Sequence, residues 1–169
     1  MLFIVGLRSN WRKTKGKRRE EILFSLSSFS PKKRFIQLLL IGDESEAMID
    51  RYLQKGNLYV GISNDISIAV CVTLIIDNTT VEIKNLAVRP DFHRCGFGRL
   101  MLKHVECENP DKSIILGTGE TPSTLRFYEK CGYRYSHRIP NFFTDNYSNP
   151  IIEEGVILRD MVYLRKDNA

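Results

Sequence analysis

The sequence predicts a mixed α/β (α+β) fold whose central sheet is mainly antiparallel. Three consecutive runs, residues 58–62, 66–76 and 80–88, have the pattern of strands and are separated by Asn-Asp and Asp-Asn, pairs that favour tight turns. These runs predict an antiparallel meander. A helical stripe at residues 97–107 and a brief apolar run at 113–116 come next, and this strand–helix–strand order implies one parallel pair of strands.

The segment before the meander predicts one strand and one helix. Residues 35–41 (FIQLLLI) form a short apolar run between Lys-Arg and Gly-Asp, with the length and flanks of a buried strand. After it, Asp43 or Ser45 can cap a surface helix of about three turns. This helix places Met48, Ile49, Tyr52 and Leu53 on one side and ends at Gly56.

Two helices are predicted after the meander. The first carries the apolar stripe of Phe97, Leu100, Met101, His104 and Val105, and it ends before Asn109-Pro110. The second has Thr121 as its N-cap and Pro122 as its first residue, and Gly132 ends it.

The C-terminal part is predicted to complete the sheet. Residues 133–138 and 155–164 have the pattern of late strands, and an aromatic loop at residues 141–149 (NFFTDNYSN) joins them. His104, on the apolar stripe, is expected to be a core histidine.

Composition predicts one compact domain preceded by a basic leader. The chain has 169 residues, 43% of them hydrophobic, and no apolar run approaches the roughly 20 residues of a membrane span. Residues 1–34 hold 10 Lys/Arg against 2 Glu, a balance of +8, and residues 35–169 hold 15 Lys/Arg against 18 Asp/Glu, a balance of −3. The domain is therefore expected at 35–169, in a cytoplasmic protein without a membrane anchor or secretion signal.

Three interpretations of the basic leader, residues 1–34, remain open. Its run WRKTKGKRRE can contact nucleic acid or another anionic surface, it can be a solvated leader, or it can come from a misjudged translation start. Beyond this leader the sequence does not indicate a nucleic-acid partner.

The cysteines and histidines do not predict a metal site. The four cysteines, at 71, 95, 107 and 131, form no C-x-x-C pair, and the three histidines, at 93, 104 and 137, complete no metal-ligand spacing. Cys71 and Cys131 are expected to be buried, reduced thiols.

A glycine-containing turn is the strongest candidate for ligand binding. In RPDFHRCGFGRLML, residues 89–102, a strand leads into a turn and the turn leads into a helix, whose first N–H groups attract anions. Gly96 and Gly98 let a ligand approach the backbone, and Arg94 and Arg99 add positive charge. The alternative is a tight turn with solvated arginines.

Two nucleotide motifs are absent from the chain. The turn lacks the third glycine of the dinucleotide fingerprint, and LGTGETPST, residues 116–124, lacks the Gly-Lys of a P-loop. Neither NAD nor ATP is favoured.

Three segments resemble the GNAT superfamily of acetyl-coenzyme A dependent N-acetyltransferases. They are VEIKNLAVRP at residues 81–90, HRCGFG at 93–98 and TLRFYEKCGY at 124–133. The resemblance spans roughly residues 35–165 and implies the family's sheet with helices on both faces. The family has Arg or Gln where this chain has His93, and that departure weakens the motif.

The resemblance implies a set of site residues. The turn would cradle the pyrophosphate of the coenzyme, and strand backbone would pair with its pantetheine arm. The implied coenzyme-binding residues are Leu86, Ala87, Val88, His93, Arg94, Cys95, Gly96, Phe97, Gly98 and Arg99, with Thr121 and Ser123 before the last helix. Acetyl-coenzyme A is the implied co-substrate, without a metal.

Two residues match the family's catalytic positions. Tyr128 would protonate or hydrogen-bond the leaving thiolate; because a phenol is a weaker acid than a thiol, its role is chiefly hydrogen bonding. The alternative is a core tyrosine. Glu82 would take the proton of the amine through a water, and the alternative is an ordinary solvent-facing glutamate.

The acceptor pocket is predicted around the aromatic loop. Phe142, Phe143 and Tyr147 can line a pocket for an amine, with Asp145, Glu153 or Asp160 attracting its charge. The alternative is that these aromatics only plug the end of the core.

Two functions from different classes follow. The first is an N-acetyltransferase acting on a primary amine of a small molecule or a protein, by direct attack in a ternary complex. The second is a catalytically silent coenzyme-binding or interaction module on the same fold, because fold alone does not decide activity. The acceptor remains open, as does the oligomeric state, including a homodimer.

Overall fold

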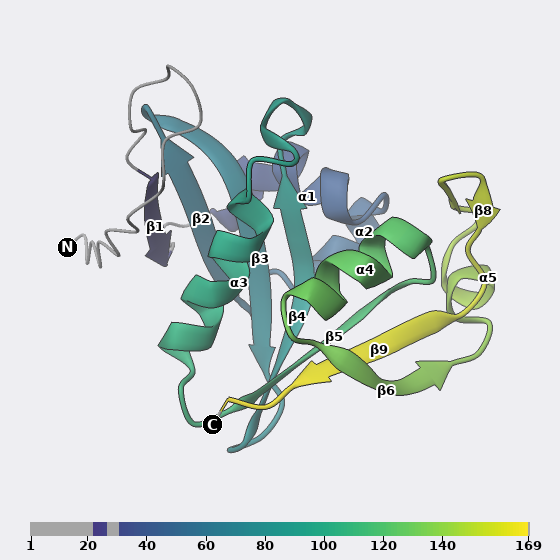
Figure 1. Cartoon of the computed structure of the whole chain (residues 1–169). Helices are drawn as coiled ribbons and strands as arrows, with labels where there is room; N and C mark the ends of the chain where they lie inside the picture. Colours follow the sequence, from purple (N-terminus) through teal and green to yellow (C-terminus); the bar gives the residue numbers. More distant parts are fainter. Residues whose placement is uncertain (1–21, 27–30, 169) are drawn as a thin grey trace. The chain divides into compact units, whose positions relative to one another are not determined.

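The structure is a computed structural model that describes residues 22–26 and 31–168. These residues form two compact units. The first contains the described residues up to Thr73 together with Asn85–Val105, and the second contains Leu74–Lys84 and the residues from Glu106 onward. Figure 1 shows the order of the elements along the chain.

The predicted fold class, a mixed and mainly antiparallel sheet with helices, is confirmed. In the first unit the strands are neighbours in the order β1 (Ile22–Leu26), β2 (Asn57–Ser63), β3 (Ile66–Ile75) and β4 (Thr80–Val88). The pairs β1–β2 and β2–β3 are antiparallel. The turn between β2 and β3 is Asn64-Asp65, both left-handed (φ 48° and 62°), as a two-residue hairpin requires.

The second unit contains the predicted parallel pair. Here the order is β4, β5 (Ser113–Gly119), β9 (Met161–Lys166) and β6 (Arg134–Ile139). Strands β4 and β5 are parallel, whereas β5–β9 and β6–β9 are antiparallel. The meander, the parallel pair and the strand at 133–138 are therefore where the sequence places them.

The predicted strand at residues 35–41 is wrong. A 3-10 turn, η1 (Lys32–Phe35), leads into helix α1 (Ile36–Gly42). Phe35, Leu38 and Leu39 are buried at the helical spacing i, i+3, i+4, while Gln37 and Ile41 are exposed. This spacing is the signal that separates a helix from a buried strand in such a short run.

Helix α2 (Glu46–Asp50) is shorter than the three turns expected. Of the two predicted caps, Ser45 is the one used, because its hydroxyl accepts from the backbone N–H of Met48 at 3.3 Å. Beyond Asp50 the chain continues in turns, and Lys32 Nζ donates to the carbonyls of Leu53 and Gln54 there, at 3.2 and 3.1 Å.

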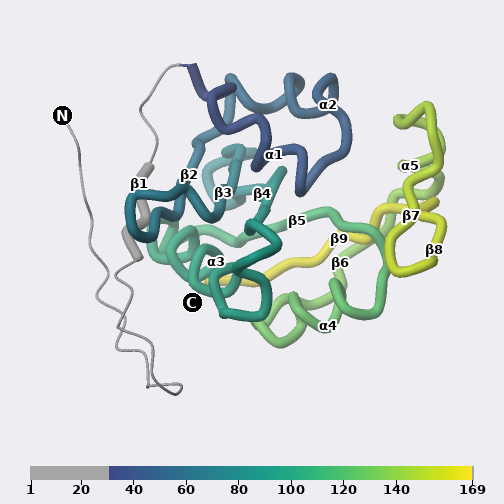
Figure 2. The backbone as a smooth tube through the Cα atoms, turned by 90° about the horizontal axis from the view of Figure 1, so that it is seen from above, coloured from purple at the N-terminus to yellow at the C-terminus, as the bar shows by residue number. Residues whose placement is uncertain are grey.

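Helices cover both faces of the sheet in the first unit. Helix α3 (Phe97–Glu108), predicted at 97–107, lies on the face opposite to α1 and α2, as the view in Figure 2 shows. His104 is buried, as expected, and its ring packs edge-on against Tyr59 with centroids 5.6 Å apart.

The predicted last helix is also present. Helix α4 (Pro122–Lys130) starts after Thr121, and Gly132, with φ +93°, follows its end. Lys166 of β9 donates to the carbonyl of Cys131 at 2.9 Å and forms an ion pair with Glu106 at 2.8 Å. These bonds tie the end of α4 to the sheet.

The C-terminal region differs in part from the prediction. The aromatic loop contains a short helix, α5 (Phe142–Asn146), and the predicted strand at 155–164 is interrupted. It consists of β8 (Val156–Ile157), which pairs with β7 (Ile152–Glu153), and of the separate β9. The break has a packing cause, because Leu158 turns inward and is buried with Phe143 and Ile151.

The predicted basic leader lies mostly outside the described residues, including the whole run WRKTKGKRRE. Within residues 1–34 the described parts are β1, which pairs with β2, and the start of η1. In the described part of the chain, none of the helices is long and apolar enough to cross a membrane.

The buried side chain of Asn85 links β4 to two other segments of the first unit by hydrogen bonds. It is 3% exposed, and its amide donates to the carbonyl of Leu39 at 2.9 Å and to the hydroxyl of Tyr52 at 3.0 Å. We expect Asn85→Ala to lower the free energy of unfolding by about 2 kcal/mol, because a buried acceptor loses its donor. Urea denaturation measures this; Asn57→Ala at an exposed position is the control, and equal effects of the two changes would contradict the prediction.

Candidate functional site

The turn that opens α3 has the backbone geometry of an anion-binding nest. Strand β4 ends at Val88, a 3-10 turn η2 (Pro90–Phe92) follows, and α3 begins at Phe97. Between them Arg94 and Gly96 are left-handed, with φ of 60° and 87°. Left-handed residues alternating with ordinary ones direct successive N–H groups to one side, and the first N–H groups of a helix have no acceptor within it.

Packing and hydrogen bonds fix this turn. Phe97 is 7% exposed and packs on Phe92, with ring centroids 5.6 Å apart. The Arg89 N–H donates to the carbonyl of Ile68 at 2.8 Å. His93, the departure from the family pattern, donates from Nε2 to the carbonyl of Val88 at 2.8 Å and so closes the turn onto the end of β4.

The predicted coenzyme-binding residues of the first unit lie together along this short stretch of chain. Ala87 is buried, Leu86 and Val88 are half-buried, and the side chains of Arg94, Cys95 and Arg99 are exposed. Gly98 lies in the first turn of α3. Nε2 of His93 already donates to the carbonyl of Val88. A pantetheine arm that pairs with Val88 would therefore depend on the backbone N–H of Val88.

Glu82 is not the solvent-facing glutamate of the alternative interpretation. It lies in the part of β4 that belongs to the second unit and is 7% exposed. Its Oε1 accepts from the hydroxyl of Tyr163 at 2.7 Å and from Nζ of Lys84 at 2.8 Å. A buried carboxylate with charged and neutral donors is held in a defined orientation.

Tyr163 is a functional candidate that the sequence analysis missed. It lies on β9, and the ring of His137 from β6 stacks on it with centroids 4.5 Å apart and planes 12° apart. Burial, and then the bond to Glu82, raise the pKa of Tyr163 above its ordinary value of 10.0. The hydroxyl therefore stays protonated at neutral pH. Tyr163 is 81 residues from Glu82 in the sequence, so no local pattern connects them.

The two predicted polar contacts at the start of α4, its N-cap Thr121 and Ser123 in its first turn, are not equivalent. Thr121 is fully buried, and its hydroxyl donates to that of Thr124 at 2.9 Å. Ser123 is exposed, and its hydroxyl donates to Glu154. Of the two, Ser123 is the one that a ligand can reach without repacking the turn.

Tyr128 lies on α4 and is half-buried. Its ring packs edge-on against Phe127, with centroids 5.0 Å apart, and against Tyr133, at 6.0 Å. Tyr133 is 1% exposed and belongs to the hydrophobic core. Tyr128 is thus neither fully buried nor fully exposed, and its catalytic role stays a prediction.

The three aromatic candidates for the acceptor pocket belong to a small apolar cluster. Phe143 is buried with Ile151 and Leu158, and Phe142 and Tyr147 pack against this group. In the structure these side chains pack between α5 and the segment before β9. A role in substrate binding stays a prediction.

Of the acidic residues predicted to attract an amine, Asp160 is already paired. It accepts from Arg138 at 3.0 Å and from the N–H of Asn141 at 2.9 Å, while Asp145 and Glu153 are exposed. The N–H of Asn141, and then Arg138, lower the pKa of Asp160 below its ordinary value of 3.8.

The lowered pKa of Asp160 predicts an acid-sensitive contribution to stability. A group with a lowered pKa in the folded state stabilises the fold above its unfolded pKa and loses this effect as the pH falls through the folded value. We therefore expect Asp160→Asn to be less stable than the wild type at pH 7, with a difference that shrinks below pH 3.8. Thermal unfolding across this range measures it. Asp145→Asn is the control, and a difference that is constant with pH would contradict the prediction.

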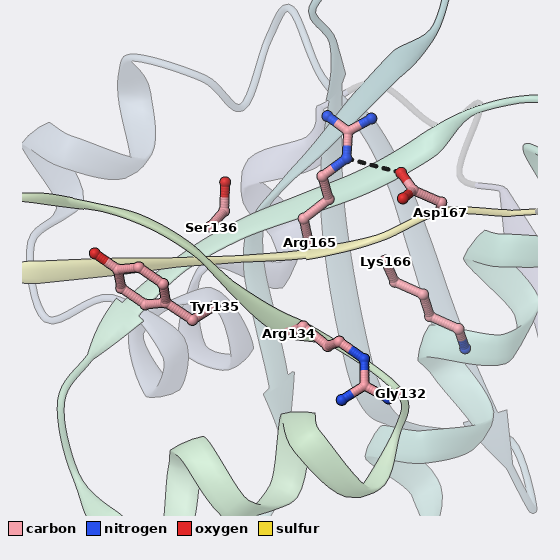
Figure 3. Close-up of a pocket in the computed structure, with 7 residues that line it drawn as sticks. All are labelled: Gly132, Arg134, Tyr135, Ser136, Arg165, Lys166 and Asp167. Atoms are coloured by element: carbon pink, nitrogen blue, oxygen red, sulfur yellow. Dashed lines mark hydrogen bonds and ion pairs between the residues drawn. The ribbon is translucent and has the colours of Figure 1, made fainter.

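The larger pocket in the second unit contains none of the predicted site residues. It has a volume of about 470 Å³ and is shown in Figure 3. Two of the cationic side chains that line this pocket form ion pairs. Arg165 pairs with Asp167 at 2.7 Å, and Lys166 pairs with Glu106. Its lining residues are Gly132, Arg134, Tyr135, Ser136, Arg165, Lys166 and Asp167.

A smaller pocket, of about 110 Å³, lies beside β8. Arg138 is bonded there to Glu120 at 2.7 Å as well as to Asp160. The two carboxylates therefore share one guanidinium.

The four cysteines differ in burial. Cys71 is fully buried, and burial raises the pKa of its thiol above the ordinary 9.0, so this thiol stays protonated. Cys131 is half-buried, while Cys95 and Cys107 are exposed. Among residues 22–26 and 31–168, no group of three or more His, Cys, Asp or Glu side chains is placed to hold a metal ion.

Comparisons with known proteins identify the family. Residues 54–135 match the family described as the acetyltransferase (GNAT) domain. An uncharacterized N-acetyltransferase of Bacillus subtilis, YvbK, is 37% identical over 134 residues, which are 77% of this chain and 86% of that protein.

Two solved structures agree with this match. A GNAT family acetyltransferase of Elizabethkingia anophelis with acetyl-CoA bound has a TM-score of 0.79 at 35% identity, covering 86% of this chain and 97% of that one. A Bacillus subtilis acetyltransferase in complex with CoA has a TM-score of 0.75 at 32% identity, covering 85% and 97%.

The chain belongs to the GNAT acetyltransferase family. It is an acyltransferase, and the two solved structures that it resembles contain acetyl-CoA or CoA.

Proposed function

We propose that the protein transfers the acetyl group of acetyl-coenzyme A to a primary amine of a small molecule or a protein, by direct attack in a ternary complex. The observation that carries this proposal is the buried carboxylate of Glu82, whose Oε1 is fixed by two donors. An amine must lose a proton before it can attack a thioester, and a positioned carboxylate can take that proton through a water.

Each step of the reaction is assigned to a group of this chain. The N–H groups of the turn from Arg94 to Arg99 bind the pyrophosphate, and Ser123 adds a polar contact to the coenzyme. The neutral amine forms a C–N bond with the acetyl carbon, and an N–H of β4, at Ala87 or Val88, stabilises the oxyanion. The C–S bond then breaks and Tyr128 donates a hydrogen bond or its proton to the departing thiolate. The nitrogen of the new amide releases its excess proton, which replaces any proton that Tyr128 has given.

Direct attack is distinguished from a covalent acetyl-enzyme by steady-state kinetics. Free thiol release is measured with a panel of amines while the concentrations of acetyl-coenzyme A and amine are varied together. We expect intersecting lines in the double-reciprocal plots, since both substrates must be bound at once. Parallel lines would indicate a covalent intermediate, and no release with any amine would instead support a catalytically silent module.

A further inference from the structure

Strand geometry brings Lys84 to Glu82. Side chains two residues apart on a strand lie on the same face, and here Nζ of Lys84 lies 2.8 Å from Oε1 of Glu82. The Lys84 side chain is 27% exposed and that of Glu82 is 10% exposed. The ion pair therefore lies at the edge of the buried region, where solvent screens it only in part.

A glycine lets Tyr163 reach the same carboxylate from two strands away. Strand β5 lies between β4 and β9, with Ile115 opposite Glu82 and Gly117 opposite Tyr163. A Cβ at Gly117 would lie 3.0 Å from Cε2 of Tyr163 and would also collide with the Sδ of Met161. Because Gly117 has no side chain, the ring of Tyr163 can lie across β5 and place its hydroxyl 2.7 Å from Glu82.

In the described part of the second unit, the other groups around Glu82 are not donors to its carboxylate. In the second unit, β5 contributes Ile115 and Gly117, which are uncharged, and β9 contributes Arg165, which is bonded to Asp167. Strand β6 contributes His137, which stacks on the ring of Tyr163. Both hydrogen bonds that the described residues give to the Glu82 carboxylate are on Oε1.

We infer that Tyr163 and Lys84 are positioning residues that hold Glu82 through Oε1, so that Oε2 is the atom that takes the proton of the acceptor amine. This inference rests on the role of Glu82 in the proposed function. The ammonium of the acceptor passes one proton, directly or through one water, to Oε2 and becomes the neutral nucleophile. Tyr163 keeps its own proton throughout and donates a hydrogen bond only.

The test compares the pH dependence of kcat/KM for the amine in wild type, Tyr163→Phe and Lys84→Met. Since each variant removes one of the two donors to the Glu82 carboxylate, we expect the acid limb of the profile to move to higher pH in both variants. We expect kcat to fall while KM for acetyl-coenzyme A stays unchanged. Lys84→Arg keeps a cationic donor, so its profile should match that of the wild type, unlike that of Lys84→Met.

Matched controls separate positioning from general structural damage. Tyr135→Phe removes the hydroxyl of a tyrosine that is 64% exposed on β6 and should leave the profile unchanged. His137→Gln is measured alongside, because the ring of His137 stacks on that of Tyr163. Proton NMR gives a readout that does not need turnover: the Tyr163 hydroxyl should give a slowly exchanging resonance that is lost in Tyr163→Phe and shifted in Glu82→Gln.

The outcomes distinguish this inference from the proposed function. If Glu82→Gln abolishes the acid limb but Tyr163→Phe and Lys84→Met leave it in place, the positioning role is overturned. If Glu82→Gln keeps the wild-type profile, the role of Glu82 as the base fails. The hydroxyl resonance then still decides whether Tyr163 holds Glu82, and its absence from the wild type would overturn that contact.

Discussion

Tyr128→Phe is expected to lower kcat about a hundredfold, at the lower end of what a positioned acid or base contributes. The KM for acetyl-coenzyme A should change little, because the ring of Tyr128 keeps its packing against Phe127 and Tyr133. The loss should fall on the step in which the C–S bond breaks. Free thiol release at saturating concentrations of both substrates measures it.

The control for Tyr128→Phe is Tyr135→Phe, the same chemical change at an exposed position of the same unit. Circular dichroism and coenzyme binding show whether the two variants fold equally well. An unchanged kcat in Tyr128→Phe would return this residue to the alternative interpretation, a tyrosine that only packs in the core.

Gly96→Ala is expected to weaken coenzyme A binding by at least tenfold, equivalent to about 1.4 kcal/mol. Gly96 has φ +87°, a conformation that costs an L-residue about 1–2 kcal/mol, and the new methyl group would lie in the turn that we propose to bind the pyrophosphate. Isothermal titration with coenzyme A measures the affinity, and thermal unfolding measures the strain.

Gly155→Ala is the matched control for Gly96→Ala. Gly155 is also left-handed, with φ +77°, and a Cβ there meets no other atom within 4 Å. Both variants should lose similar stability, but only Gly96→Ala should lose affinity. Equal affinities in the two variants would show that the turn before α3 does not bind the pyrophosphate.

Local patterns predicted the part of the fold in which hydrogen bonds join neighbouring segments. The meander and its Asn64-Asp65 turn, the parallel pair β4–β5 and helices α3 and α4 follow from turn chemistry, apolar spacing and caps within a few residues. The run at residues 35–41 failed for a physical reason. A run of seven residues, six of them apolar, satisfies a buried strand and a helix equally, and only the burial of Leu38 and Leu39 beside exposed Gln37 decides between them.

The candidate site was predictable only where its residues are close in sequence. The turn from His93 to Gly98 is one segment, so its glycines and arginines could be found by inspection. The environment of Glu82 could not, because its donor Tyr163 comes from a distant strand and reaches it only where β5 has a glycine. Gly117 was visible in LGTGETPST, but as part of a nucleotide loop that the sequence does not complete.

The apolar cluster of Phe143, Ile151 and Leu158 has a consequence for motion. A segment held by three buried side chains opens at a lower free energy than strands that share a larger core. The chain between β6 and β9 is therefore expected to open while β5 and β9 stay folded. Amide hydrogen exchange should show this stretch losing protection before β5 and β9.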